Sequence, residues 1–237
     1  MRNTVPAALA LGLLSSCAQA HAPAAREIVR LPATCHKATL HLTIVGDSLA
    51  RGWGASNPRG TFAALLYRQI RKTYSSATLD NLGIPGATTD DIAKKEADRI
   101  ATRPCSLVVL IAGANDVQKL YTPAHFRTSY TALIRKIRER LPDGALMVIG
   151  LPNISLSPLI PWILKPVESQ LAKADNVAIA DAARQSGAAF VPMYDLSQRN
   201  ADRTNHLLSH DGIHPNDRGY FIMATAAAPA VAKLTHP

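Results

Sequence analysis

The sequence is poor in cysteine and in aromatic residues, and both shortages narrow what the chain can be. Three cysteines are too few for a disulfide scaffold and lack the spacing of a zinc site. Aromatic residues make up 5% of the 237 residues and charged residues 18%, while 13 Gly and 16 Pro are ordinary numbers. This composition excludes collagen-like, low-complexity and disordered chains. A chain of this length can bury a hydrophobic core large enough to fold without disulfides or bound metals.

Acidic residues are scarce relative to basic ones, 17 against 26, so the net charge is +9. A basic chain can bind nucleic acid or an anionic surface, but net charge alone shows neither. The basic clusters, Tyr67–Lys72 and Arg135–Arg140, fall on predicted helices and have no aromatic residues between their basic side chains. Nucleic-acid grooves usually add such stacking platforms. We therefore expect no nucleic-acid partner and a surface charge suited to an anionic envelope.

No apolar run reaches the roughly twenty residues that a membrane-spanning helix needs. Residues 1–20 instead combine Arg2 with a short apolar run, Val5–Leu14, which is typical of a secretory signal peptide. Two processing sites fit this segment. Cleavage after Ala20 would satisfy the small-x-small rule, whereas residues 14–17 resemble a lipobox in which Cys17 is lipidated and tethers the chain to a membrane. In both cases we expect an exported protein, periplasmic or secreted, that is soluble unless it is tethered.

Short apolar segments alternate five times with helical patterns along the rest of the chain. Ser106–Ala112, for example, is almost entirely apolar, as a strand buried on both faces must be. The predicted strands are 39–45, 78–82, 106–112, 145–150 and 188–191, and the predicted helices are 62–74, 89–102, 123–141, 167–187 and 217–234. This alternation predicts an α/β domain with a parallel sheet between two helix layers. We expect one domain, residues 38–237, after a loose segment through Lys37.

Polar residues follow several of the predicted strands, where open parallel sheets carry their chemistry. The loops in question are Gly46–Leu49, Asn81–Gly86, Gly113–Asp116 and, after the fifth strand, Asp211–Asn216. Taken singly, such residues usually cap helices or turn the chain. Together they supply a hydroxyl nucleophile, a histidine base, an orienting carboxylate and oxyanion donors, which are the parts of a serine esterase.

The spacing of Asp211 and His214 suits this chemistry. Three residues across a tight turn let the carboxylate reach Nδ1 of the imidazole, which leaves Nε2 free to face a serine. His206, His210 and His214 recur every four residues, which on a helix would suggest a metal site. Gly212 and Pro215 break that helix, so we expect no metal.

With Ser48, Gly83, Asn115 and His214 in this order, the chain resembles the SGNH, or GDSL, hydrolase family from about residue 40 to its C-terminus. It is most similar to the exported bacterial esterase, thioesterase and lysophospholipase branch. The resemblance implies a flavodoxin-like, three-layer α/β/α fold with five parallel strands in the order 2-1-3-4-5. The loops after the first three strands would then converge at the switch point of the sheet.

The same resemblance implies a role for each site residue and a reaction without a cofactor. Ser48 is the expected nucleophile, His214 the general base and then acid, and Asp211 the residue that orients His214. The amides of Ser48 and Gly83 and the side chain of Asn115 are the expected oxyanion hole. The expected substrate is a small-molecule carboxylic ester or thioester, including lipid esters, cleaved through an acyl-enzyme.

Two other functions stay open at this point. Acyl transfer to an acceptor other than water would use the same residues, and a non-catalytic envelope or carbohydrate-binding module could share the fold. The segment Asn153–Lys165 is apolar and carries two prolines. We interpret it as a wall or lid of the acyl site, with Leu159, Trp162 and Ile163 contacting an acyl group longer than acetyl. Oligomeric state is not predictable from the sequence.

The remaining cysteines and two acidic residues complete the predictions. Cys35 and Cys105 both lie just ahead of predicted strands, so they would fall at one sheet edge if those strands are neighbours. Because export implies an oxidising compartment, we expect that these two cysteines can pair. Asp47 and Asp116 adjoin predicted catalytic positions, and we interpret both as hydrogen-bond acceptors that fix the loops.

Overall fold

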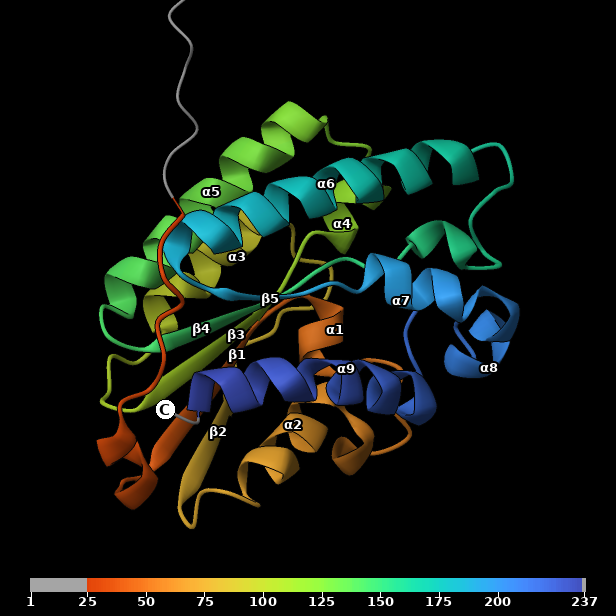
Figure 1. Ribbon diagram of the computed structural model, residues 1–237. Helices are drawn as coiled ribbons and strands as arrows, with labels where there is room; N and C mark the ends of the chain where they lie inside the picture. The colour runs from red at the N-terminus through yellow and green to blue at the C-terminus, as the bar shows by residue number, and fades with distance from the viewer. Residues whose placement is uncertain (1–24, 236–237) are drawn as a thin grey trace, which may run out of the picture.

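The computed structural model describes residues 25–235 as three layers, with a parallel five-stranded sheet between two layers of helices (Figure 1). All strand pairs are parallel, and the order is β2-β1-β3-β4-β5. The predicted fold class and strand order are therefore confirmed. The strands are β1 Leu40–Gly46, β2 Ala77–Asn81, β3 Ser106–Ile111, β4 Ala145–Ile149 and β5 Ala189–Val191.

Burial of the strands follows their position in the sheet. Every residue of the inner strands β3 and β4 is buried, which fits their apolar sequences. The edge strand β2 alternates half-buried and exposed residues, with Thr78 and Asp80 facing solvent. The most apolar strands thus lie at the centre of the sheet.

The helices divide between the two faces of the sheet (Figure 1). Helix α2, Phe62–Ile70, and helix α9, Asp217–Thr235, pack with the short helix α1, Ser48–Arg51, on one face, where they share a hydrophobic cluster with one side of the strands. On the other face lie α3, Thr89–Lys95, α5, Pro123–Arg140, and α6, Lys165–Ser186. Several of these helices begin at a threonine side chain that accepts a backbone N–H, which is the usual N-cap.

Short helices that the sequence pattern does not predict come after β1, β3 and β5, with two of them in succession after β5. They are α1 Ser48–Arg51, α4 Ala114–Gln118, α7 Tyr194–Arg199 and α8 Thr204–Leu207. Helices of one turn contain too few residues to show a hydrophobic period, so only their caps could have indicated them. The predicted helix 89–102 is also shorter than expected. It ends at Lys95 because Glu96 turns into the protein interior and accepts the N–H of Gly46 at 2.8 Å.

The segment before Lys37, predicted to be loose, packs against the domain. The N–H of Val29 donates to the carbonyl of Gly187, and that of Leu31 donates to Leu234. Leu31 is buried, and Cys35 forms a disulfide with Cys105. The folded unit therefore begins ahead of residue 38, because a buried leucine and a covalent link hold the segment in place.

The predicted signal peptide and Cys17 lie outside the described residues. Among the helices of residues 25–235, none is both long enough and apolar enough to cross a membrane.

Candidate active site

Ser48 opens helix α1, directly after strand β1. The preceding residue, Asp47, is the N-cap, and its Oδ1 accepts the N–H of Leu49 at 2.9 Å. This cap leaves the N–H of Ser48 itself without an acceptor among the described residues, at the positive end of the helix dipole. The fold thus places a hydroxyl and an unpaired amide on the same residue.

His214 joins Ser48 to Asp211 across the carboxyl edge of the sheet. His214 Nε2 lies 2.8 Å from Ser48 Oγ, and His214 Nδ1 lies 2.7 Å from Asp211 Oδ2. The structure therefore brings the three predicted catalytic residues together in the order nucleophile, base and orienting carboxylate. In this network Nδ1 carries the hydrogen toward Asp211, and Nε2 is free to accept from the serine.

The turn that carries Asp211 and His214 is held by its own carboxylate. Asp211 Oδ1 accepts the backbone N–H groups of Ile213, at 3.0 Å, and His214, at 2.9 Å. Burial alone would raise the pKa of Asp211, but hydrogen bonds from Ile213, His214 and Ser209 outweigh it and hold that pKa well below its usual range. Asp211 is therefore ionised throughout the pH range in which an esterase works.

Asn216 fixes this turn to helix α9, a role that the sequence analysis did not assign. Its Nδ2 donates to the carbonyls of His206 and Leu208, and its Oδ1 accepts the N–H groups of Arg218 and Gly219 at the start of α9. An asparagine just ahead of a helix is the sequence signal that could have indicated this cap.

One predicted oxyanion donor, Asn115, lies at the site. It sits in the first turn of α4, and its Nδ2 donates to the carbonyl of Ala87 at 3.0 Å. An amide has two hydrogens, so this bond fixes the side chain and leaves the second hydrogen available. Asn115 and Ser48 line the same pocket.

The other predicted donor, Gly83, does not lie at the site. It is buried, its N–H donates to Asn81 Oδ1 at 3.0 Å, and it does not line the pocket. A Cβ at this position would lie 2.7 Å from the Arg51 nitrogen and 3.0 Å from the Asp47 carbonyl oxygen. Gly83 is therefore a glycine because the loop packs closely on helix α1, and the structure corrects the role expected for it.

Gly86, three residues later in the same loop, lines the pocket beside Ser48 and Asn115. It has a φ of +78°, and a Cβ added there would contact nothing within 4 Å. Its N–H has no acceptor within residues 25–235. The amide of this loop that is free to face a substrate is thus that of Gly86, not that of Gly83. The dipeptide Pro85-Gly86 is a turn signal that could have pointed to this position.

Three buried acidic side chains, Asp47, Glu96 and Asp116, accept hydrogen bonds next to these loops. Glu96 accepts the Gly46 N–H, and Asp116 accepts both the N–H and the hydroxyl of Thr89. Burial raises the pKa of Asp47 to about 7 and that of Glu96 to about 8, and burial also raises the pKa of Asp116. Asp47 and Asp116 therefore act as loop-fixing acceptors, as interpreted from the sequence.

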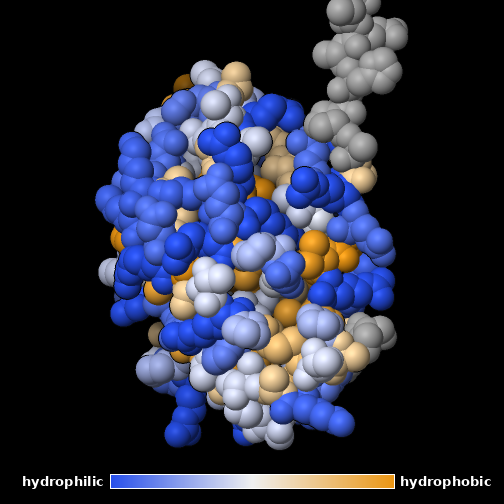
Figure 2. Space-filling view, turned by 90° about the vertical axis from the view of Figure 1, so that its left-hand side faces the viewer, coloured by the Kyte–Doolittle hydropathy of each residue, from blue (hydrophilic) through white to orange (hydrophobic). Residues whose placement is uncertain are grey.

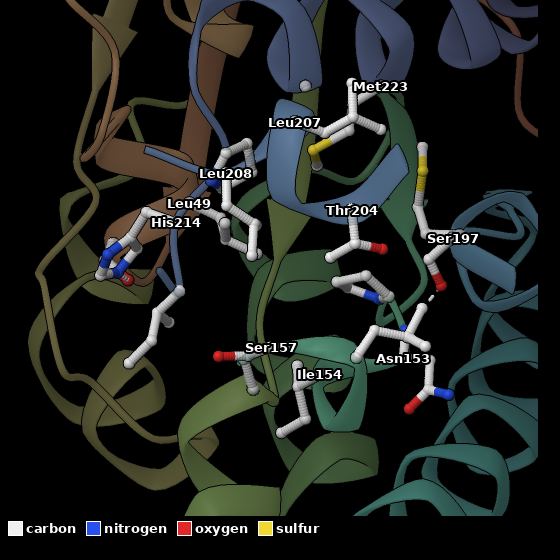
Figure 3. A pocket seen from close by; sticks show the side chains of 18 of the residues that line it. Leu49, Asn153, Ile154, Ser157, Ser197, Thr204, Leu207, Leu208, His214 and Met223 are labelled. Atoms are coloured by element: carbon white, nitrogen blue, oxygen red, sulfur yellow. Dashed lines mark hydrogen bonds between the residues drawn. The ribbon is translucent and has the colours of Figure 1, made fainter. Parts of the chain in front are cut away.

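An apolar pocket of about 320 Å³ adjoins Ser48 and His214. Figure 3 shows His214 and Leu49 at one side of this pocket, with Asn153 and Ser197 at the other. Its wall is formed mainly by aliphatic and methionine side chains: Ile154, Leu156, Ile160, Met193, Leu196, Leu207, Leu208, Ile222 and Met223. The polar groups at the far side are already paired, since the Asn153 N–H donates to Ser197 Oγ at 2.8 Å. The pocket is therefore suited to an apolar chain.

The segment 153–165 contributes to this wall, but not through the residues expected. A short 3-10 helix, Ile154–Leu156, turns Ile154 and Leu156 toward the pocket, and Ile160 follows them. The structure does not bring Leu159, Trp162 and Ile163 into the pocket lining. They are 59%, 82% and 65% exposed, because the chain turns outward between Pro158 and Lys165.

The described residues contain no group of three or more His, Cys, Asp or Glu side chains placed to hold a metal. His206 lies in helix α8 and His210 in the turn just before Asp211, and neither lines the pocket.

Comparisons with known proteins agree with this geometry. Residues 44–222 match the GDSL-like Lipase/Acylhydrolase family. No curated protein sequence matches the chain.

Solved structures with a similar fold include the lipase Lip_vut3 from a goat rumen metagenome, 19% identical, with a TM-score of 0.68 over 83% of this chain and 99% of that one. TesA is 22% identical, with a TM-score of 0.65 over 82% and 99% of the two chains. A mutant of Axe2, an acetyl-xylooligosaccharide esterase from Geobacillus Stearmophilus, is 16% identical, with a TM-score of 0.63 over 81% and 94%. At these identities the likeness concerns the fold, while the family match spans most of the sequence, so the chain belongs to the GDSL-like lipase/acylhydrolase family of serine ester hydrolases.

Proposed function

We propose that this enzyme hydrolyses esters or thioesters whose acyl group is apolar and longer than acetyl, through an acyl-enzyme on Ser48. The observation that carries this proposal is the contact of Ser48 Oγ with His214 Nε2 at 2.8 Å, at the mouth of an apolar pocket of about 320 Å³. This volume lies within the range of roughly 300–1,000 Å³ that small-molecule pockets have, so the pocket has room for a chain of several methylene groups.

In the first half of the reaction, Ser48 Oγ attacks the carbonyl carbon while its proton passes to His214 Nε2. The carbonyl oxygen becomes an oxyanion within reach of the amides of Ser48 and Gly86 and the free hydrogen of Asn115. His214 then gives the proton to the leaving alcohol or thiol, and the acyl group stays on Ser48. Asp211 stabilises the imidazolium that forms between these two proton transfers.

In the second half, water attacks the acyl carbon and gives its proton to His214. The carbon–oxygen bond to Ser48 breaks, the serine recovers the proton, and the carboxylic acid leaves. Both half-reactions use the same three residues, and the proton transfers of the second run opposite to those of the first, so no cofactor is required.

A panel of p-nitrophenyl esters from acetyl to lauroyl tests this function. We expect kcat/KM to rise from acetyl to a medium-chain optimum and to fall to background in the Ser48→Ala variant. Highest activity on the acetyl ester would remove the chain-length part of the proposal. Activity that survives Ser48→Ala would overturn the assigned nucleophile, and a folded wild type inactive on every ester would refute the function.

We also propose that the protein is exported. The Cys35–Cys105 disulfide supports this, because such bonds persist in oxidising compartments, and so does the signal-peptide pattern of residues 1–20. Mass spectrometry of the mature N-terminus distinguishes a lipidated Cys17 from a start at His21. An unprocessed N-terminus in the native host would contradict export.

A further inference from the structure

Large apolar side chains are exposed at the pocket and on the segment that continues its wall past Leu156 and Ile160. Trp53, Leu159, Trp162, Ile163 and Ile213 are between 39% and 82% exposed, and we call these five residues the apolar rim. Figure 2 shows another side of the molecule, toward the amino ends of the strands, where hydrophilic side chains predominate and apolar ones occupy small areas. Exposed apolar groups that gather at one site mark a surface that binds something apolar.

The apolar rim is continuous with the catalytic residues. Trp53 and Ile213 line the pocket directly, and the Trp53 ring lies 6.1 Å from that of His214. On the other side, Ser157 Oγ donates to the Gly212 carbonyl at 2.6 Å, and Leu159 packs against Gly212. Whatever covers the rim therefore also meets the entrance through which a substrate passes.

The part of the rim farthest from the pocket is preformed. The N–H groups of Leu164 and Lys165 donate to the Pro161 carbonyl at 2.8 and 3.2 Å, which closes a tight turn around Trp162 and Ile163. Prolines at 158, 161 and 166 restrict the backbone further. Trp162 is thus held outward by ordered backbone, and docking would cost little conformational entropy.

We propose that the apolar rim docks on an anionic phospholipid bilayer and places the pocket mouth against the lipid, so that the substrate is a lipid ester drawn directly from the membrane. This rests on the function proposed above. A protein seated on the rim would close the pocket, whereas a bilayer both covers the rim and supplies acyl chains to it. Tryptophan side chains favour the membrane–water boundary, where one part of the ring is apolar and the indole N–H stays hydrated.

The charge of the protein agrees with an anionic lipid surface. Arg51 lies two residues before Trp53, and Lys165 lies two residues after Ile163. Without residues 1–20, whose only charged side chain is Arg2, the chain carries a net charge of 25 − 17 = +8. Basic side chains beside inserted apolar groups strengthen binding to anionic lipids, and salt weakens this contribution.

The sequence offers a direct probe of docking, because its only two tryptophans, Trp53 and Trp162, both belong to the rim. Fluorescence of the Ser48→Ala variant, which cannot consume the lipid, is recorded with phosphatidylglycerol vesicles and with phosphatidylcholine vesicles. We expect a blue shift and quenching by bromine-labelled acyl chains with phosphatidylglycerol, weakened by salt. An unchanged spectrum with both lipids would overturn the proposal, and equal binding to both would refute its anionic part.

A pair of variants separates docking from catalysis. In the double variant Trp162→Ser with Ile163→Ser, we expect vesicle binding, measured by sedimentation in the Ser48→Ala background, to fall roughly ten-fold or more. In the catalytically intact background, its kcat/KM on a soluble p-nitrophenyl ester should stay near that of the wild type. The matched control is Val177→Ser, which changes a 57% exposed residue on α6 and should alter neither property.

The outcomes distinguish this inference from the proposed function. Wild-type vesicle binding in the double variant, with soluble activity intact, overturns the docking surface and leaves the esterase standing. A wild type that hydrolyses no soluble ester would instead refute the proposed function. Concentration-dependent dimerisation lost in the double variant, without vesicle binding, would assign the rim to a second copy of the chain and overturn the bilayer.

Discussion

Asp211→Asn tests the catalytic arrangement most directly, because the carboxylate does two separate things. Oδ1 accepts two backbone N–H groups, and Oδ2 faces His214 Nδ1 at 2.7 Å. An asparagine has only one acceptor oxygen. If that oxygen keeps the two backbone bonds, the NH2 group faces the imidazole. The opposite orientation would set the NH2 group against two backbone donors, so the structure selects the first.

In that orientation the asparagine NH2 donates to Nδ1 of His214. The imidazole hydrogen then sits on Nε2, which points at Ser48 Oγ and can no longer accept its proton. A wrong tautomer of this kind costs about 10⁴ in kcat in a serine protease triad. At about 1.36 kcal/mol per factor of ten, this corresponds to roughly 5.5 kcal/mol of lost transition-state stabilisation.

The assay is kcat on a soluble p-nitrophenyl ester, with thermal unfolding as the control. Asp211→Asn should unfold near the wild-type temperature because the backbone bonds remain. Asp211→Ala should lose activity as well, and it should also lose about 1–3 kcal/mol of stability because the Ile213 and His214 N–H groups lose their acceptor. An Asp211→Asn variant that keeps more than a tenth of wild-type kcat would show that His214 is oriented by another group, and the reasoning would fail.

Four further predictions follow from single features of the structure. Asn115→Ala should lower kcat on soluble esters by about 10² to 10³, as loss of one oxyanion donor does, and a change below ten-fold would contradict its role. Ile154→Trp should fill part of the pocket and move the best ester toward shorter acyl chains, as measured on the p-nitrophenyl panel; an unchanged optimum would contradict it. Burial raises the pKa of Glu96 from its ordinary 4.5 to about 8, so the folded chain holds a proton that the unfolded chain releases, and stability should fall by a few kcal/mol as pH rises through that window. Glu96→Gln should flatten this dependence in urea unfolding, and an unaltered slope would refute the assignment. The Cys35–Cys105 bond spans 70 residues, so the Cys35→Ser and Cys105→Ser double variant should lose about 4 kcal/mol of unfolding free energy on the chain-entropy model, without loss of kcat; wild-type stability would contradict this.

The strands and the Asp211–His214 pair were accessible from the sequence because their signals are local, whereas the strand order and the role of Ser48 were implied by the family resemblance. Buried strands such as β3 are almost wholly apolar, so the segment Ser106–Ile111 is visible without its neighbours. Asp211 and His214 meet across one tight turn, and their spacing alone predicts the contact. Only the approach of Ser48, 166 residues away, needs the fold, and parallel strands bring their carboxyl ends together.

The choice between Gly83 and Gly86 was not accessible in the same way. Both are glycines in one loop after β2, and both fit a turn. What separates them is the packing of this loop on helix α1, which buries Gly83 and leaves the Gly86 amide facing the pocket. A one-turn helix has no period in the sequence, so the contact that decides the question is not predicted.

The sequence also did not predict which side chains form the pocket wall. The apolar character of segment 153–165 indicates that it meets something apolar, but it does not state which side chains do so. The 3-10 turn Ile154–Leu156 directs the first residues inward, and the turn at Pro161 directs Trp162 outward. Composition predicts the existence of an apolar surface, while backbone geometry assigns each residue to the pocket or to solvent.

The buried carboxyl groups explain why the catalytic loops keep their positions. Apolar residues in place of Asp47, Glu96 and Asp116 would avoid the desolvation cost that raises the pKa of each. Such residues would also release the N–H groups of Gly46 and Leu49, which flank Ser48 closely, and of Thr89, which ends the loop that carries Gly86. We infer that these acids hold the catalytic loops in place and that their burial lowers the free energy of unfolding. Glu96→Gln tests this, because it keeps an acceptor for Gly46 without an ionisable group: it should retain kcat and gain stability at alkaline pH. A loss of kcat with no such gain would show that the carboxyl group of Glu96 has a role that an amide cannot fill.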